Sequence, residues 1–208
     1  MKIAILVEGA TEKAFKPILI RFLEQYLQQR MPQLKFVPSQ GRIPKKDKLK
    51  SMVEKLLTGK DACNAVIALT DVYTGSEDFK DAADAKAQMK AWVGNNPNFY
   101  PHAAQYDFEA WLLPFWSTIQ QLAKHNKSAP SGKPNQVNHE KPPSQRIKEI
   151  FELGTSRRSY DKVRDGKKIL EKNDLMVSVQ ACEELKDFIN TILLLCGGIL
   201  IGSSPKTK

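Results

Sequence analysis

The stretch KIAILVEGATE at residues 2–12 constrains the possible fold more than any other part of this chain. Its apolar run IAILV has no alternation of polar and apolar residues, which is typical of a parallel strand covered on both faces. Gly9 then permits a tight turn, and Thr11 is a candidate N-cap for a helix that runs to about Arg30. Glu8 therefore falls at the carboxyl end of a buried strand, where open α/β sheets place their ligands. The alternative is that Glu8 only caps or solvates the strand end.

The length and the cysteine content favour one domain in a reducing compartment. With 208 residues, 41% of them hydrophobic, the chain can bury a sizeable core. Cys63, Cys182 and Cys196 form no CxxC pair, so neither a disulfide framework nor a zinc site is expected. The amino terminus lacks a signal-peptide pattern, and the apolar segment 188–202 is too short and too interrupted to span a membrane. We therefore expect a cytoplasmic protein with no membrane segment.

The chain is strongly basic. Its net charge is +9, from 32 Lys and Arg against 23 Asp and Glu, and its isoelectric point is near 9.4. This balance favours polyanionic partners, since lysine and arginine contact phosphates without reading a sequence. Nucleic acid is the expected partner, and the alternative is a generally basic protein with no such ligand.

Strands and helices alternate after the first helix. Strands are predicted at residues 34–37, 65–70 and 102–106. Helices are predicted at 47–57, 110–123, 144–151, 161–172 and 179–196, and a further helix follows the polar loop 74–84 and runs to about residue 93. The stretch 124–143 is rich in Pro, Asn, Ser and Lys and is predicted to be a long functional or mobile loop. The expected fold is therefore an α/β core at 1–123 with a mostly parallel sheet, a loop at 124–143, a helical extension packed on the core at 144–202, and a tail at 203–208.

Three of the predicted strands end in acidic residues. Glu8 follows the first strand, Asp71 follows the strand at 65–70, and Asp107 and Glu109 follow the strand at 102–106. If these strands are parallel neighbours, their carboxyl ends converge on one edge of the sheet. Clustered carboxylates repel one another, and oxygen ligands suit Mg²⁺ or Mn²⁺, so the set predicts a divalent metal site. The alternative is that each acid caps a helix or pairs with one of the abundant lysines.

The motifs carry a resemblance to a known fold family. VEGATE followed by a strand ending in LTD resembles the Toprim domain of topoisomerases, primases and overcoming-lysogenization-defect nucleases. The fuller pattern VEGATE, ALTDVY, QYDFEAWL, KPPSQRI and YDK resembles a bacterial family of small stand-alone Toprim-like proteins of unknown function, over roughly residues 1–196. This resemblance implies a Toprim-like sheet, with Glu8 as general acid/base or metal-shell glutamate and Asp71 as metal ligand.

The sequence departs from the Toprim pattern at one position. Toprim enzymes usually carry Asp-x-Asp after the third strand, whereas Asp71 is followed by Val72 and Tyr73. Glu109 or Asp107 from the next strand can replace the missing acid. We prefer Glu109 as the ligand and take Asp107 as an alternative ligand or as a residue that orients the others.

The basic and hydroxyl residues after the long loop are candidates for binding a substrate phosphate. They are Lys141, Ser144, Arg146, Tyr160 and Lys162. Ser144 can equally cap a helix, and Arg146 can be a plain surface charge.

The combined prediction is a Mg²⁺- or Mn²⁺-dependent nuclease or phosphotransfer enzyme acting on nucleic acid. Resemblance to phage-defence nucleases extends it to a role in phage defence beside an ATPase partner. The competing prediction is a Toprim-fold module that has lost full metal chemistry and binds nucleic acid or a partner protein. A nucleotide-binding regulator is a third alternative, since the helix amino terminus after Glu8 can hold a phosphate. It is weaker because Glu8 and Glu12 flank that terminus and repel an anion.

Overall fold

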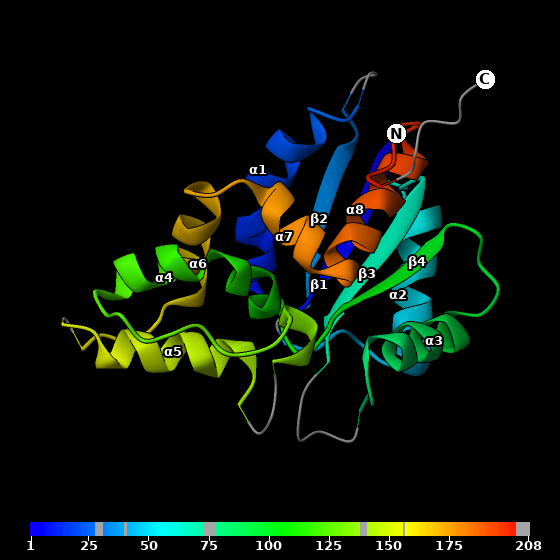
Figure 1. Cartoon of the computed structure of the whole chain (residues 1–208). Coiled ribbons are helices and arrows are strands. Elements are labelled where there is room, and N and C mark those ends of the chain that lie inside the picture. Colours follow the sequence, from blue (N-terminus) through cyan, green and yellow to red (C-terminus); the bar gives the residue numbers. More distant parts are fainter. Residues whose placement is uncertain (28–30, 40, 73–77, 138–140, 156, 203–208) are drawn as a thin grey trace.

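The computed structural model describes residues 1–27, 31–39, 41–72, 78–137, 141–155 and 157–202. Its centre is a four-stranded parallel sheet in the order β2-β1-β3-β4 (Figure 1). The strands are β1 (Lys2–Val7), β2 (Gln33–Pro38), β3 (Ala65–Asp71) and β4 (Phe99–Ala104). They are connected by α1 (Ala10–Leu23), α2 (Lys46–Thr58) and α3 (Ala82–Val93). The elements after β4 are η1 (Phe108–Phe115), α4 (Trp116–Ala123), η2 (Pro134–Gln136), α5 (Pro143–Leu153), α6 (Lys162–Glu171), α7 (Leu175–Ala181) and α8 (Glu183–Leu195).

The sheet is covered on both faces, as the continuous apolar runs predict. Ile3, Ile5 and Val7 face the cluster that includes α1, η1 and the C-terminal helices, whereas Ala4 and Leu6 face α2 and α3. Figure 1 shows α2 and α3 on one face and α1, α7 and α8 on the other. Side chains alternate between the faces of a strand, so only a strand that is apolar at every position suits this place.

The strand order places a topological switch point between β1 and β3. The chain runs from β1 to β2 on one side and then returns to pair β3 with the other side of β1, with Ile3 opposite Ala65 and Leu6 opposite Ala68. The carboxyl ends of two adjacent central strands therefore lead into loops that diverge, which opens a crevice at this edge. Glu8 and Asp71 stand at these two ends.

The C-terminal helices share the larger core with the sheet. Phe151 of α5, Ile169 of α6 and Phe188 of α8 are fully buried in the same cluster as Ile5 of β1. The predicted α/β class with a parallel sheet and a helical C-terminal extension is confirmed. The division at residues 123 and 143 stays a prediction, since this packing does not test it.

The fourth strand begins and ends earlier in the sequence than predicted. It spans Phe99–Ala104 rather than residues 102–106, because Pro101 lies inside the strand instead of ending the preceding turn. β4 is at the edge of the sheet, and Val66 and Val72 donate to the carbonyls of Asn98 and Ala104. Even-numbered residues of β4 therefore face β3, and the proline nitrogen lies on the outer edge, where no hydrogen bond is lost.

Three helix predictions also change. The first helix ends at Leu23 rather than near Arg30, and its N-cap is Gly9 rather than Thr11. The segment predicted as one helix at 110–123 begins as the 3-10 helix η1, and the helix predicted at 179–196 is broken at Cys182, whose φ and ψ are −124° and 102°. No helix within the described residues is long and apolar enough to cross a membrane.

Gly154 generates a prediction about how α5 is held. It ends α5, and a Cβ atom at this position would lie 1.8 Å from the carbonyl oxygen of Ala123 at the end of α4. We expect Gly154→Ala to lower the free energy of unfolding by roughly 1–3 kcal/mol, because backbone must move to admit the methyl group. Urea denaturation followed by circular dichroism measures this. A variant as stable as the wild type would show that the α4–α5 contact is looser than described.

Candidate active site

Glu8 connects the ends of the two central strands in the candidate site. Glu8 directly follows β1, and its side chain is only 4% exposed although it is charged. Its Oε1 atom accepts hydrogen bonds from the hydroxyl of Thr70 and from the backbone N–H of Asp71, the latter at 3.2 Å. These bonds cross the switch point, so the Glu8 carboxylate is fixed against the end of β3.

The next acids of the site come from the segment after β4. Tyr106 has a φ of +71°, a left-handed conformation that is uncommon outside glycine, and it turns the chain from β4 into Asp107 and η1. Asp107 and Glu109 are both buried, and Asp107 Oδ2 accepts a 3.1 Å hydrogen bond from the backbone N–H of Ser144. Asp107 Oδ1 and Glu109 Oε1 are buried without a hydrogen-bond partner among the described residues. Buried carboxylate oxygens normally have a partner, so these two are candidates for binding a cation, a water or a substrate group.

One lysine faces these acids. Lys162 begins α6, and its Nζ atom lies 3.2 Å from Glu109 Oε2, with about half of the side chain (51%) exposed. Partial burial lowers the pKa of Lys162, but the charges of Glu109 and Asp107 outweigh this and raise it above its ordinary value. Lys162 therefore stays protonated and offsets one negative charge of the cluster.

Glu12 belongs to the same cluster, although the sequence analysis did not select it as a site residue. Its side chain is buried and accepts a 3.2 Å hydrogen bond from the backbone N–H of Gly9, which caps α1. Burial and the nearby charge of Glu8 raise the pKa of Glu12. Its spacing of four residues from Glu8 at the helix start was a usable signal, because the first turn of α1 carries it back to the strand end.

Burial and mutual repulsion raise the pKa values of the clustered acids. Burial, then the charges of Glu8 and Asp107, raise the pKa of Asp71 well above its ordinary value. Burial and the charge of Asp107 raise the pKa of Glu109 to about 7, even though Lys162 opposes the shift. Burial also raises the pKa of Asp107. Burial and repulsion thus oppose the ionisation of these acids, and Lys162 offsets only part of this effect at Glu109.

The proposed phosphate-binding residues divide into two groups. Ser144 contacts Asp107, Lys162 contacts Glu109, and the hydroxyl of Tyr160 is buried without a hydrogen-bond partner in the described part of the chain. Burial and the charges of Glu109 and Asp107 raise the pKa of Tyr160, so its hydroxyl stays protonated.

Lys141 and Arg146 form the second group, because their hydrogen bonds go elsewhere. Lys141 pairs with Glu149 at 2.6 Å, and Arg146 Nε donates to the backbone carbonyl of Lys141 at 3.3 Å. Within the described residues, neither forms a hydrogen bond to the clustered acids at the edge of the sheet. Their role in binding a phosphate stays a prediction.

The donor set fits a hard divalent cation in chemistry. All of its ligand atoms are carboxylate oxygens, two of which are buried and unpartnered. Among the described residues, no three His, Cys, Asp or Glu side chains are arranged to hold one ion together. A Mg²⁺ site commonly uses only one or two protein carboxylates and completes its shell with water and substrate phosphate, so the arrangement suits an ion of this kind. Tyr73, which replaces the second aspartate of the Toprim pattern, lies outside the described residues.

Comparison with known families places the chain. The profile of a family described as a domain of unknown function, DUF4276, matches residues 7–193. The chain belongs to the DUF4276 family. The match runs from the end of β1 to α8 and includes every acid of the cluster. No curated protein matches the sequence significantly.

A solved structure fixes the fold of this DUF4276 protein. The chain is similar to the C-terminal region of the OLD protein of Burkholderia pseudomallei, with a TM-score of 0.52 and 12% sequence identity. The similarity covers 94% of this chain and 98% of the other. At this identity it carries the fold and not the activity. The Toprim-like fold expected from the sequence motifs is confirmed.

The raised pKa values predict an unusual effect of Asp71→Asn on stability. A raised pKa means that Asp71 binds its proton more tightly in the folded state than in the unfolded state. Protonated Asp71 therefore stabilises the fold at low pH, and this stabilisation is lost as the pH rises through the pKa of the folded state. Without added metal, at about pH 8, we expect Asp71→Asn to raise the free energy of unfolding by roughly 1 kcal/mol or more. The gain disappears near pH 4, where Asp71 is protonated in the folded protein.

Asp165 provides the matched control, because it is a buried acid with two cationic partners. Burial raises its pKa, but hydrogen bonds from Arg158 and Arg164 outweigh this and lower it to about 2. Ionised Asp165 stabilises the fold at any pH above 3.8, the ordinary pKa of an aspartate. This stabilisation is lost as the pH falls through the folded-state pKa of about 2. Asp165→Asn should therefore destabilise the protein by roughly 2–3 kcal/mol at about pH 8. If both variants lose stability, the acids around Asp71 are structural ion-pair partners.

Proposed function

We propose that this protein is a divalent-metal-dependent Toprim-like nuclease or phosphotransfer enzyme that acts on nucleic acid. The observation that carries the proposal is the gathering of five buried acids at one edge of a parallel sheet, where Lys162 is the one lysine that pairs with them among the described residues. The acids are Glu8, Glu12, Asp71, Asp107 and Glu109. A fold does not retain uncompensated buried charge for stability alone, because burying it is costly. Perturbed acids in a crevice are typical of catalytic sites.

The chain's own residues divide the work in this proposal. Glu8 is held by Thr70 and Asp71 and is placed to take or give a proton at the reacting oxygen. Lys162 supplies a positive charge beside Glu109 for a phosphate oxygen. Tyr160, with its hydroxyl protonated and unpartnered, is a further hydrogen-bond donor.

Asp71 and Glu109 would hold the metal, with Glu8 or Asp107 contributing. A bound Mg²⁺ or Mn²⁺ offsets the negative charge of these acids and polarises a phosphoryl oxygen. The unpartnered oxygens of Glu109 and Asp107 support their part in this set.

Nucleic acid is the proposed substrate because of the charge of the chain. A net charge of +9 attracts a polyanion, although the local cluster is acidic, and phosphate contacts from lysine and arginine then overcome the repulsion around it. A cytoplasmic location agrees with the free thiols of Cys63, Cys182 and Cys196. Phage defence and an ATPase partner stay predictions that rest on the sequence resemblance alone.

The cleavage test uses charge-removing variants. Wild-type protein with Mg²⁺ or Mn²⁺ should cleave DNA or RNA, and we expect Glu8→Gln and Asp71→Asn each to lower the rate by roughly 10²-fold or more, as loss of a general acid/base or of metal binding does. Gel assays on labelled single- and double-stranded substrates measure this.

Asp61→Asn is the control for these variants. Asp61 is an exposed acid that pairs with Lys2 and Lys35 at the opposite, amino-terminal edge of the sheet. Its substitution should leave cleavage unchanged. Cleavage that persists in both Glu8→Gln and Asp71→Asn contradicts the assignment of the site.

A second candidate function is a Toprim-fold module that binds nucleic acid or a partner protein without metal chemistry. Two observations favour it: no three described acids converge on one point, and Val72 and Tyr73 stand where the Toprim pattern continues to a second aspartate. Such a module would keep its salt-dependent affinity for nucleic acid.

Metal titration separates the two candidates. The enzyme should bind Mn²⁺ in calorimetry without any nucleic acid, and saturation should raise its melting temperature at about pH 8, since the ion binds only the folded state. Glu109→Gln should weaken this binding roughly 10-fold or more, as the loss of a metal ligand or of a residue that orients a ligand does. A protein that binds oligonucleotides but shows no melting shift with Mn²⁺ is the binding module.

A further inference from the structure

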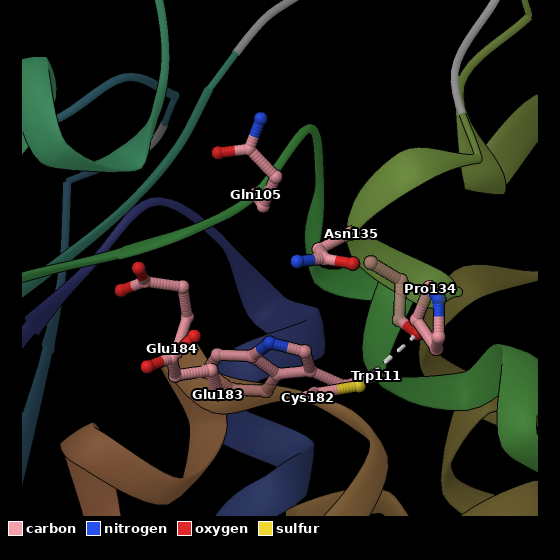
Figure 2. A pocket seen from close by; sticks show the side chains of 8 residues that line it. Gln105, Trp111, Pro134, Asn135, Cys182, Glu183 and Glu184 are labelled. Atoms are coloured by element: carbon pink, nitrogen blue, oxygen red, sulfur yellow. Dashed lines mark hydrogen bonds between the residues drawn. The ribbon is translucent and has the colours of Figure 1, made fainter. Parts of the chain in front are cut away.

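A polar cavity lies beside the acidic cluster and is not part of it. It has a volume of about 190 Å³ and opens between the end of β4, η1, η2 and the break between α7 and α8 (Figure 2). Pockets that enclose drug-sized ligands measure about 300–1,000 Å³, so this cavity suits a single small ring system.

The wall of the cavity contains an indole N–H that donates to no described residue. Trp111 is 98% buried in the core, where it packs on Phe15, Phe108 and Phe188, yet no described residue accepts a hydrogen bond from its indole N–H. Figure 2 shows the indole nitrogen on the side of the ring that faces Gln105 and Asn135. The neighbouring Trp116 is satisfied, since its indole N–H donates to the carbonyl of Lys127 at 2.8 Å. Trp111 therefore presents its donor to whatever fills the cavity.

The other polar groups of the wall are a mixture of donors and acceptors. Gln105 accepts from the N–H of Ala82 at 2.8 Å, and Figure 2 shows its amide group directed away from Trp111 and Asn135. Asn135 and Glu183 have no hydrogen-bond partner in the described part of the chain, and both line the cavity. Glu184 is already engaged, since both of its oxygens accept from Lys86 at 2.8 and 3.1 Å.

The cavity and the acidic cluster are built from one segment. Gln105 and Trp111 line the cavity, and Asp107 and Glu109 lie between them in the sequence. Residues two apart are separated by at most about 7 Å along the chain, so the cavity and the acids belong to neighbouring positions of one segment. This places a ligand phosphate at the acids and its base at the cavity within one proposed site.

We propose that this cavity receives one unpaired nucleobase that carries an exocyclic amino group, and so makes the site selective for single-stranded or unstacked nucleic acid. The inference rests on the proposed function, because it assigns the substrate class of that site. Trp111 and Asn135 donate to the ring nitrogen or carbonyl oxygen of the base, and Glu183 accepts from its amino group. Adenine, cytosine and guanine have such a group, whereas uracil and thymine lack it.

A lysine or arginine side chain of a partner protein fits the cavity less well. Of its two carboxylates, Glu184 is neutralised by Lys86, so only Glu183 remains to balance a cation. The donors of Trp111 and Asn135 would face the cation without an acceptor.

Nuclear magnetic resonance of the indole groups tests the proposal without relying on cleavage. The chain has three tryptophans, and Trp111→Phe assigns the signal of Trp111. Short single-stranded oligo-A or oligo-C, added without divalent metal, should shift this signal and bind about tenfold more tightly than oligo-T, which is the lower end of what one good hydrogen-bonded pair provides. Replacing one base of the oligonucleotide by an abasic residue at the occupied position should remove the shift.

Surface variants of the wall keep the test independent of folding. Asn135→Ala and Glu183→Gln should reduce oligo-A and oligo-C binding to the level of oligo-T, whereas Asn126→Ala, an exposed asparagine outside the cavity, should change nothing. Equal affinity for all oligonucleotides with an unmoved Trp111 signal overturns the base pocket and leaves the proposed function standing. Absence of any salt-dependent oligonucleotide binding overturns both. A Trp111 shift with an arginine-containing peptide but not with oligonucleotides overturns the base pocket in favour of a protein partner.

Discussion

Repulsion among buried carboxylates is the constraint on which the rest of this structure depends. Burial alone raises the pKa of a carboxyl group, and here the charges of neighbouring acids raise the pKa of Asp71 and Glu109 further, so that the pKa of Glu109 reaches about 7. The sheet holds the acids together regardless, because Glu8 is bonded across the switch point to Thr70 and Asp71. The stability for this arrangement comes from the apolar core beneath, where the central strands are fully buried.

The C-terminal helices contribute to the site as well as to the core. Ser144 at the start of α5 donates to Asp107, and Lys162 at the start of α6 pairs with Glu109. Both contacts come from helix amino termini, whose partial positive charge favours nearby carboxylates. A chain cut after the α/β core would therefore lose the only cation that pairs with these acids in the described residues, together with 14 of the 35 buried residues of its large hydrophobic cluster.

The sequence predicts the central strands well and the rest of the site less well, for physical reasons. Uninterrupted apolar runs identify β1 and β3, because a strand that is buried on both faces needs apolar side chains at every position. β4 was displaced because Pro101 looked like a breaker, and only the strand order shows that it lies on an edge. Glu12 was missed because its part in the cluster depends on where α1 begins. The pairing of Lys162 with Glu109 spans 53 residues, and no local pattern encodes a contact of that separation.

The position of Pro101 also bears on how copies of this protein associate. An edge strand offers unpaired N–H and C=O groups to which another strand can add, and such pairing leads to extended sheets or aggregates. At the outer edge of β4 the proline removes a donor in the middle of the strand, so an incoming strand would meet a gap in its ladder. The residue that misplaced the strand in the sequence analysis thus keeps the sheet at four strands on that side and leaves assembly to other surfaces.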